Sequence, residues 1–181
     1  MNHSDHVHLL SGGMAGEAES KPDPLWADFG SGQGAFTLAL AELLGPGGQI
    51  HSIDRDGRAL KAQSEALKAH FPEVRVVYHA ADFSLPIELP RLDGLVMANA
   101  LHFVEDRRKE AVVRLLKSYL SPGGRMILVE YNVDRGNLWV PHPLSFPTWQ
   151  ELAQRCGFTS TRLLARTPSS FLHEFYAALS L

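Results

Sequence analysis

A glycine-rich turn between an apolar run and a helix-forming run constrains this chain more than any other feature. The apolar run, residues 25–29, has the length and composition of a buried strand. The sequence GSGQG follows at residues 30–34, and residues 35–44 are rich in Ala and Leu and stop at Gly45-Pro46. Glycines let the backbone turn sharply and let a ligand lie against the main chain. The first N–H groups of a helix also lack partners within it. Strand, glycine turn and helix in this order predict a ligand-binding unit of an α/β fold.

The next predicted strand, residues 49–54, ends in a carboxylate. In a parallel sheet its C-terminal end lies beside the glycine turn, where Asp54 can accept hydrogen bonds from a ribose diol. Asp54 follows Gly30 by 24 positions (54 − 30). Nucleoside-binding α/β units place such an acid about 20 residues beyond the glycines. The unit is therefore predicted to bind a ligand that contains a nucleoside.

Two classes of cofactor fit the glycine pattern. Gly30-x-Gly32-x-x-Ala35 matches the relaxed dinucleotide pattern. Asp28-x-Gly30-x-Gly32-x-Gly34 resembles the first motif of class I, Rossmann-like methyltransferases that use S-adenosylmethionine. The Asp28 carboxylate favours the second class, because it would repel a pyrophosphate and attract the ammonium and sulfonium of S-adenosylmethionine. The alternative for Asp28 is a structural role, in which it bonds to loop amides at the strand end.

Three further stretches resemble the same family in the same order. Asp82-Phe83 follows a predicted strand at residues 74–79, and in the family such a pair holds the adenine; the alternative for Asp82 is a turn-forming role. The sequence LSPGGR at residues 120–125 commonly precedes the fifth strand of the family, here predicted at residues 125–131. A predicted hairpin of residues 159–166 and 170–178 would supply the family's antiparallel strand. The resemblance covers about residues 26–179.

The resemblance implies an α/β fold with a doubly wound, seven-stranded, mostly parallel sheet, an antiparallel C-terminal strand and helices on both faces. We predict a methyltransferase domain over residues 25–181. Residues 1–24 are predicted to form an N-terminal arm, with a short helix capped by Ser4 and stopped at Gly12, followed by a flexible connector. Residues 56–70 are predicted to form a helix with its Lys, Gln and Glu side chains facing solvent. Another helix is predicted at residues 148–156, with Thr148 as its N-cap.

The resemblance also implies which residues contact S-adenosylmethionine. Asp54 would hold the ribose, and Arg55 would flank the adenine. The backbone after the fourth strand would contact the amino-acid end of the cofactor. The predicted cofactor-binding residues are Asp28, Gly30, Ser31, Gly32, Gly34, Asp54, Arg55, Asp82, Phe83, Asn99 and Ala100.

A long aperiodic segment, residues 132–147, is predicted to border the substrate, because long loops in compact domains are usually functional or disordered. Tyr131, Trp139 and His142 are the predicted substrate-binding residues; the alternative for Trp139 is packing onto the core. His102, His142 and Tyr131 are candidate general bases, since histidine titrates near neutrality. His102 could equally be a packing residue. Methyl transfer needs no obligatory base, so the catalytic residue is left open.

Composition limits the partners. The 181-residue chain has a net charge of −3 and no block of Lys and Arg, which argues against nucleic acid. It has no apolar run that could span a bilayer and no secretory signal, so a cytoplasmic enzyme is expected. Cys156 is its only cysteine, and His3, His6 and His8 are interpreted as part of a polar arm, so no metal is expected.

The predicted function is methyl transfer from S-adenosylmethionine to a small or mid-sized organic acceptor, at oxygen, nitrogen, carbon or sulfur. Three alternatives remain open. They are an NAD(P)-dependent oxidoreductase, a non-catalytic S-adenosylmethionine-binding module and a nucleic-acid methyltransferase. Salt-sensitive binding to RNA or DNA would identify the last of these.

Overall fold

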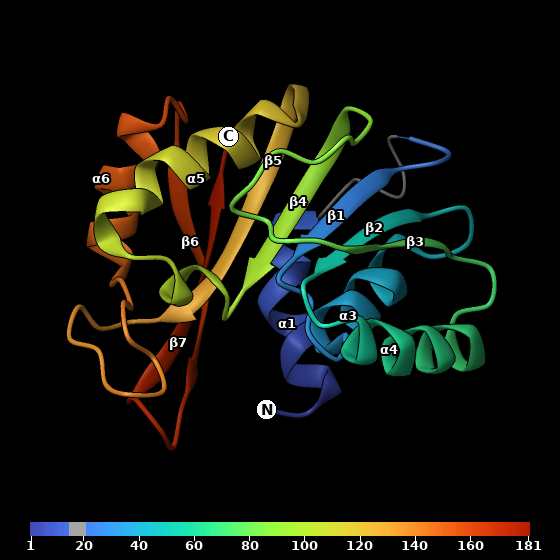
Figure 1. The fold of residues 1–181 in the computed structure, drawn as a ribbon, viewed down its shortest axis with the longest axis horizontal. Coiled ribbons are helices and arrows are strands. Elements are labelled where there is room, and N and C mark those ends of the chain that lie inside the picture. The colour runs from blue at the N-terminus through green and yellow to red at the C-terminus, as the bar shows by residue number, and fades with distance from the viewer. Residues whose placement is uncertain (15–20) are drawn as a thin grey trace.

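Seven strands form a single sheet in the order β3-β2-β1-β4-β5-β7-β6 in the computed structural model, which describes residues 1–14 and 21–181 (Figure 1). β1 to β5 are parallel, and β7 lies antiparallel between β5 and β6. The predicted fold class is therefore confirmed. The described elements are α1 (His3–Met14), β1 (Leu25–Phe29), α3 (Ala35–Leu44), β2 (Gln49–Asp54), α4 (Gly57–His70), β3 (Arg75–Ala80), β4 (Leu92–Ala98), the 3-10 helix η1 (Leu101–Phe103), α5 (Asp106–Ser118), β5 (Leu120–Tyr131), α6 (Phe146–Arg155), β6 (Thr161–Pro168) and β7 (Glu174–Ser180).

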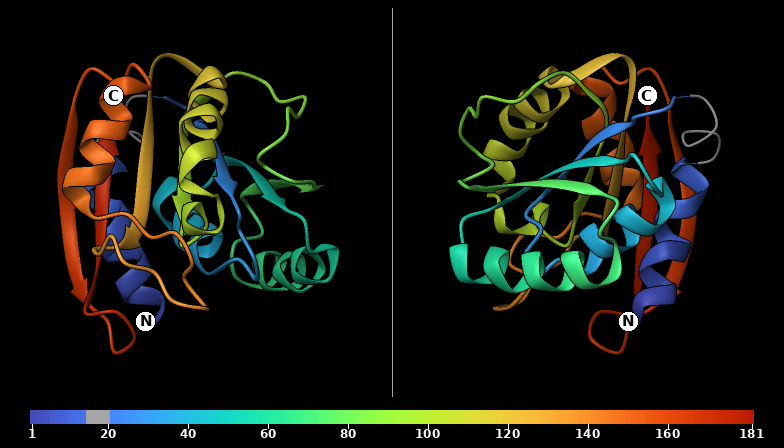
Figure 2. Two further views of the ribbon diagram at one scale, coloured as in Figure 1. Left: turned by 60° about the vertical axis from the view of Figure 1, so that its left-hand side comes forward. Right: turned by 90° about the vertical axis from the view of Figure 1, so that its right-hand side faces the viewer.

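Helices cover both faces of the sheet, and the sheet separates the core into two layers (Figure 2). Successive side chains of a strand point to opposite faces. Leu95 of β4 accordingly packs in the layer under α5 and α6, and Val96 packs in the layer under α1, α3 and α4. Because both faces are covered, the central strands read as continuous apolar runs. Such runs lack the alternation that marks a half-exposed strand.

The N-terminal helix is longer than predicted. α1 continues through Gly12, which was expected to stop it, and ends at Met14. Ser4 is not the cap. Asn2 caps the helix, because its Oδ1 accepts from the Asp5 N–H at 3.0 Å while the Asp5 carboxylate accepts from the Asn2 N–H at 2.8 Å. The predicted connector falls partly on residues 15–20, which lie outside the described residues.

α1 packs against the sheet as part of the core. Leu9 and Leu10 are fully buried in the same layer as α3. A Cβ on Gly13 would lie 2.6 Å from Cδ1 of Ile127 in β5. Gly13, which was expected to lie in the connector, therefore allows the last turn of α1 to approach the sheet closely.

Other boundaries also differ from the prediction. β5 was expected to begin at Arg125 and instead begins at Leu120, with a shift of register against β4 between Leu92 and Gly94. Ser145, and not Thr148, caps α6, and Pro147 lies in the first turn, where no N–H donor is needed. The terminal hairpin turns at residues 169–173, later than expected, and β6 runs on to Pro168. A proline is tolerated there because β6 is an edge strand of the sheet.

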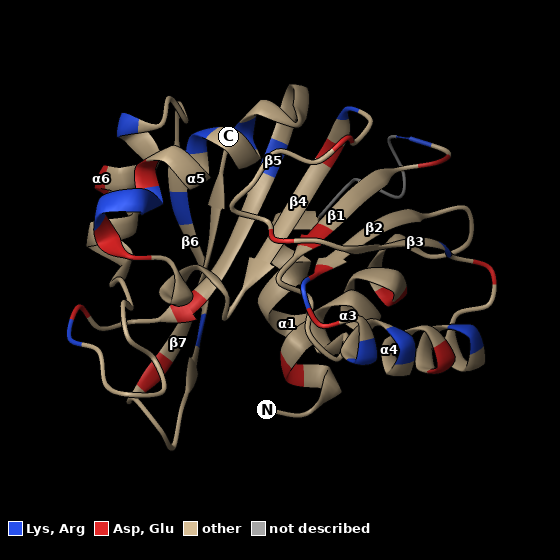
Figure 3. Ribbon diagram, viewed as in Figure 1, with Lys and Arg blue, Asp and Glu red and all other residues tan. Residues whose placement is uncertain are grey.

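Charged residues of both signs are interspersed on α4 and α5 (Figure 3). This pattern agrees with the small net charge of −3. Among residues 1–14 and 21–181, no helix combines the length and the apolar character needed to cross a bilayer.

Leu10→Ala should lower the free energy of unfolding by about 2–5 kcal/mol, because it removes a fully buried side chain from the contact between α1 and the sheet. Urea denaturation followed by circular dichroism measures this loss. Leu85→Ala is the matched control: its side chain is 56% exposed, so a change of less than about 0.5 kcal/mol is expected. Equal stability of Leu10→Ala and the parent chain would mean that α1 does not hold its place in solution.

Candidate functional site

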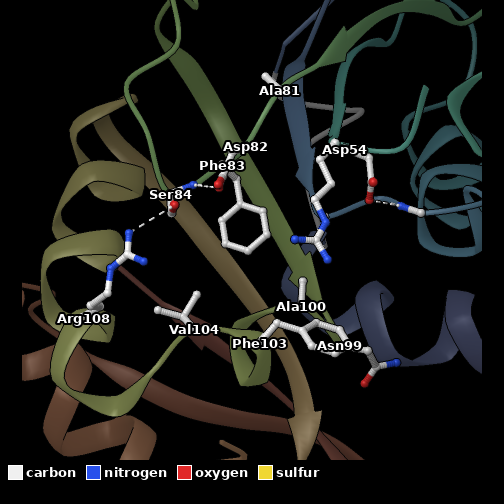
Figure 4. A pocket seen from close by; sticks show the side chains of 13 residues that line it. Asp54, Ala81, Asp82, Phe83, Ser84, Asn99, Ala100, Phe103, Val104 and Arg108 are labelled. Carbon is white, nitrogen blue, oxygen red and sulfur yellow. Dashed lines mark hydrogen bonds between the residues drawn. The ribbon is translucent and has the colours of Figure 1, made fainter. Parts of the chain in front are cut away.

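A cavity of about 450 Å³ opens at the C-terminal ends of β1, β2 and β4 (Figure 4). This volume falls in the range of about 300–1,000 Å³ typical of small-molecule sites. Doubly wound sheets bind ligands at this place, where the strand order reverses. The lining residues are Gly30, Gly32, Asp54, Arg55, Ala81, Asp82, Phe83, Ser84, Asn99, Ala100, Phe103, Val104 and Arg108. They include all of the predicted cofactor-binding residues except Asp28, Ser31 and Gly34.

The glycine turn presents bare backbone to this cavity. Gly32 has a φ of +52°, and a Cβ on it would have no atom within 4 Å, so this position faces open space. Gly30 has a φ of +77°, and a Cβ there would lie 2.4 Å from the Cβ of Ala100. Gly30 thus lets the loop after β4 approach the turn, while Gly32 leaves room for a ligand.

Asp54 is fixed by two backbone amides. Its Oδ2 accepts from the Gly32 N–H and its Oδ1 from the Asp56 N–H, both at 2.8 Å. The turn is also tied to β2 through Ile53, whose carbonyl oxygen accepts from the Gly30 N–H at 2.8 Å. The predicted proximity of the glycine turn and the end of β2 is confirmed, and the Asp54 carboxylate lines the cavity in a set orientation.

The opposite side of the cavity is formed by a loop. Residues 81–91 connect β3 to β4 without a helix. Asp82 lines the cavity and also forms a turn, since its Oδ1 accepts from the Ser84 N–H at 2.8 Å. Hydrogen bonds from Ser84 lower the pKa of Asp82. Figure 4 shows the ring of Phe83 projecting from this loop toward Ala100. The turn-forming and ligand-facing interpretations of Asp82 are therefore compatible.

Asp28 lies behind the glycine turn. Its carboxylate is 1% exposed, and its Oδ2 accepts from the Thr37 hydroxyl of α3 at 2.6 Å. Burial raises the pKa of Asp28 to about 7, against the opposing effect of the Thr37 hydrogen bond. Contact between Asp28 and a cationic ligand remains a prediction.

Ser31 and Gly34 also turn away from the cavity, toward Gln63 of α4. Gln63 is fully buried, so its predicted solvent-facing position is wrong. The glycine turn supplies polar partners for its amide, and a buried amide is tolerated when it is hydrogen-bonded. Helical periodicity alone carries no sign of such partners.

A buried histidine–carboxylate pair joins η1, which follows β4, to the neighbouring strand β5. His102 is 3% exposed, and its Nδ1 lies 2.9 Å from both carboxylate oxygens of Glu130, which is fully buried in β5. Nδ1 must carry the hydrogen to bond these oxygens, so Nε2 is the free acceptor of the ring. Sequence reasoning missed Glu130. Its one signal is a lone carboxylate at the end of an apolar strand.

The three predicted substrate-binding residues have different surroundings. The Tyr131 ring lies 6.0 Å from that of His102, measured between centroids. The His142 N–H donates to the His102 carbonyl oxygen at 3.0 Å, which anchors the long loop beside η1. Trp139 is 72% exposed at the loop tip, so it does not pack onto the core. The structure brings His102, Tyr131 and His142 together, and Trp139 is exposed in the same loop as His142.

The N-terminal histidines take part in the contact between α1 and α3. His3 pairs with Glu42 at 2.7 Å, and the His6 ring packs on Phe36 with centroids 4.7 Å apart. Within the part of the chain that the structure describes, His, Cys, Asp and Glu side chains form no group of three suited to a metal ion.

The comparison with protein families identifies the chain. The model of the methyltransferase-domain family matches residues 27–124, which is more than half of the sequence. The chain therefore belongs to this family, and its Rossmann-like fold is that of the class I methyltransferases that use S-adenosylmethionine.

Known proteins of similar sequence or fold carry related names. An acetylserotonin O-methyltransferase of Mus musculus molossinus is 26% identical over 193 residues, which cover 94% of this chain and 48% of that protein. The chain spans about half the length of the curated relatives it matches. The magnesium protoporphyrin IX methyltransferase of Synechocystis, solved with bound S-adenosylmethionine, has a TM-score of 0.70 at 15% identity and covers 97% of this chain and 79% of its own. A 1,6-didemethyltoxoflavin-N1-methyltransferase of Burkholderia thailandensis, solved with S-adenosylhomocysteine, has a TM-score of 0.70 at 20% identity. The match covers 98% of this chain and 79% of that one.

Asp28→Asn should flatten the pH dependence of stability. Because burial raises the pKa of Asp28 from its ordinary 3.8 to about 7, the folded state holds this proton more tightly than the unfolded state. The stability that this group contributes is full below pH 4 and is lost as the pH rises through 7. The loss amounts to about 4 kcal/mol, an order-of-magnitude value. Urea denaturation at pH 5 and pH 8 should show the parent chain losing stability relative to Asp28→Asn. Parallel behaviour of the two proteins would contradict a protonated Asp28.

Proposed function

We propose that this chain transfers a methyl group from S-adenosylmethionine to a small or mid-sized organic acceptor. The observation that carries the proposal is the pair formed by Gly32, open toward the cavity, and Asp54, fixed by backbone amides at its rim. Together they suit a ribose whose hydroxyls need an oriented acceptor close to bare backbone. Family membership supports the same cofactor.

The other lining residues fit the remaining parts of this cofactor. We assign Asp82 and Phe83, which line the cavity, to the adenine, and Arg55, which also lines it, to the flank of the same ring. The Oδ1 of Asn99 is buried and has no hydrogen-bond partner among the described residues. It offers an acceptor to an ammonium group, since a buried unpaired oxygen gains from a donor. When bound, the cofactor supplies an electrophilic sulfonium methyl group.

We assign His102 as the general base for acceptors that must lose a proton. Glu130 holds Nδ1 and leaves Nε2 free to accept that proton. Tyr131 is a weaker candidate, because burial and the nearby Glu130 raise the pKa of its phenol and keep it protonated. His142 has a less fixed ring, which is partly exposed and lies 3.9 Å from Asp106.

The acceptor site is proposed between Tyr131 and the loop of residues 132–145. Phe103 is 61% exposed and lines the cavity, and its ring lies 4.3 Å from that of His102. Rings therefore continue from the cavity through His102 to Tyr131, which suits a planar organic molecule. The exposed Trp139 is available to contact such an acceptor at the rim. The names of related proteins, which include acetylserotonin and demethylmenaquinone, agree with small organic acceptors.

Calorimetric titration with S-adenosylhomocysteine, run beside NAD and NADP, tests the cofactor. Binding of S-adenosylhomocysteine alone is expected.

Asp54→Ala should weaken the binding of S-adenosylhomocysteine by about 1–3 kcal/mol, the scale of a hydrogen bond to a charged group. Gly32→Val should abolish it, because the new side chain would enter the open cavity. Glu65→Ala, on the exposed face of α4, is the control and should bind like the parent chain. Binding of a nicotinamide dinucleotide alone would refute the proposal.

Removal of the proposed base tests the chemistry. His102→Ala should lower kcat by about 10²–10⁴-fold, the usual contribution of a general base, while S-adenosylhomocysteine binds as before. Rates of S-adenosylhomocysteine formation are measured with acetylserotonin, demethylmenaquinone and further phenols and amines as acceptors. His70→Ala, which removes an exposed histidine at the end of α4 that does not line the cavity, is the control and should retain the parental activity. Full activity of His102→Ala would remove it as the base. Cofactor binding with no turnover of any acceptor would indicate a non-catalytic module.

A further inference from the structure

We propose that Gln63 is a positioning residue that holds the glycine turn in its ligand-binding shape; the inference rests on the proposed cofactor site. Gln63 lies in α4, does not line the cavity and is fully buried. Its Nε2 donates to the Gly32 carbonyl oxygen at 3.1 Å and lies 3.2 Å from the Ser31 hydroxyl. Its Oε1 accepts from the Ser52 hydroxyl of β2 at 2.7 Å. Both ends of the amide are therefore occupied.

Gly32 is held from both sides. Asp54 accepts from its N–H, and Gln63 donates to its carbonyl oxygen. Its φ of +52° lies in the left-handed region, which is only one of the conformations that a free glycine populates, so the two anchors select it. With both neighbouring peptide groups fixed, Gly32 presents its open side to the cavity. The two anchors come from β2 and from the helix that follows it.

The aliphatic part of Gln63 explains the third glycine of the motif. A Cβ on Gly34 would lie 2.4 Å from Cγ and 2.8 Å from Cδ of Gln63. Gly34 does not line the cavity, so its lack of a side chain makes room for Gln63. The Gly34 N–H closes the turn by donating to the Ser31 carbonyl oxygen at 2.9 Å. Gln63 and Gly34 therefore form one packing unit beneath the turn.

Gln63 does not line the cavity, so loss of its amide should weaken ligand binding only by releasing the glycine turn. A turn that is no longer fixed occupies its binding-competent shape for only a fraction of the time. The apparent Kd then rises by the inverse of that fraction. The free energy of one hydrogen bond corresponds to about a tenfold change.

Gln63→Met tests the role, because Met keeps the length and apolar stem of the side chain and removes the amide. The control is Ser52→Ala, which removes another member of the same buried network and leaves the bond from Gln63 to Gly32. Calorimetry with S-adenosylhomocysteine should give about tenfold weaker binding for Gln63→Met and a change below about threefold for Ser52→Ala. Hydrogen exchange of the ligand-free proteins should be faster at residues 30–34 in Gln63→Met only.

The possible outcomes separate this inference from the proposed function. If the parent chain does not bind S-adenosylhomocysteine, the proposed function fails. Hydrogen exchange at residues 30–34 then still tests whether Gln63 fixes the glycine turn. Folded Gln63→Met with parental affinity and exchange would overturn the inference. Equal loss in both variants would also overturn it, because the network would then support only the fold. If Gln63→Met does not fold, Gln63→Leu replaces it, because Leu keeps an apolar side chain of similar volume and has no donor for the Gly32 carbonyl oxygen.

Discussion

The hydrogen bond from the Gly32 N–H to the Asp54 carboxylate is the contact on which the site depends. It joins the turn after β1 to the end of β2, two places that meet only because the strands are parallel neighbours. The bond fixes the carboxylate and the backbone together, so each defines the position of the other. The buried core on both faces of the sheet keeps the two strand ends in register. The ligand then meets a surface whose shape was set when the chain folded.

The sequence allowed the bounds of β1, α3 and β2 to be predicted because their signals are local. An apolar run, three glycines and a terminal acid each act within a few residues of where they stand. The predictions failed where a distant partner decides the outcome. α1 continues through Gly12 and Gly13 because Gly13, without a side chain, packs directly against Ile127 of β5, and Gln63 is buried because the glycine turn satisfies its amide. Periodicity measures hydrophobicity along one segment, so it cannot register a partner elsewhere in the chain.

The cavity and the proposed acceptor side are built differently. The proposed cofactor side is held mainly by backbone amides and a buried side-chain network. The acceptor side is formed by rings and by a loop that a few contacts attach, such as the bond between the His142 N–H and the His102 carbonyl oxygen. A shared cofactor needs one fixed site, whereas acceptors differ, and loops on a rigid scaffold can vary. This explains why the sequence predicts the cofactor side in more detail than the acceptor side.

Several buried polar groups lie at the end of the sheet that carries the cavity. Asp28, Gln63 and Glu130 are almost fully buried, and each bonds to a side chain or backbone group near the cavity or the proposed base. Apolar residues there would give a simpler core, since burying a polar group costs free energy unless it is fully bonded. Local rules of folding are broken most often where function requires it. The positions of these three residues therefore connect the glycine turn and the His102 pair as parts of one proposed functional region at the end of the sheet.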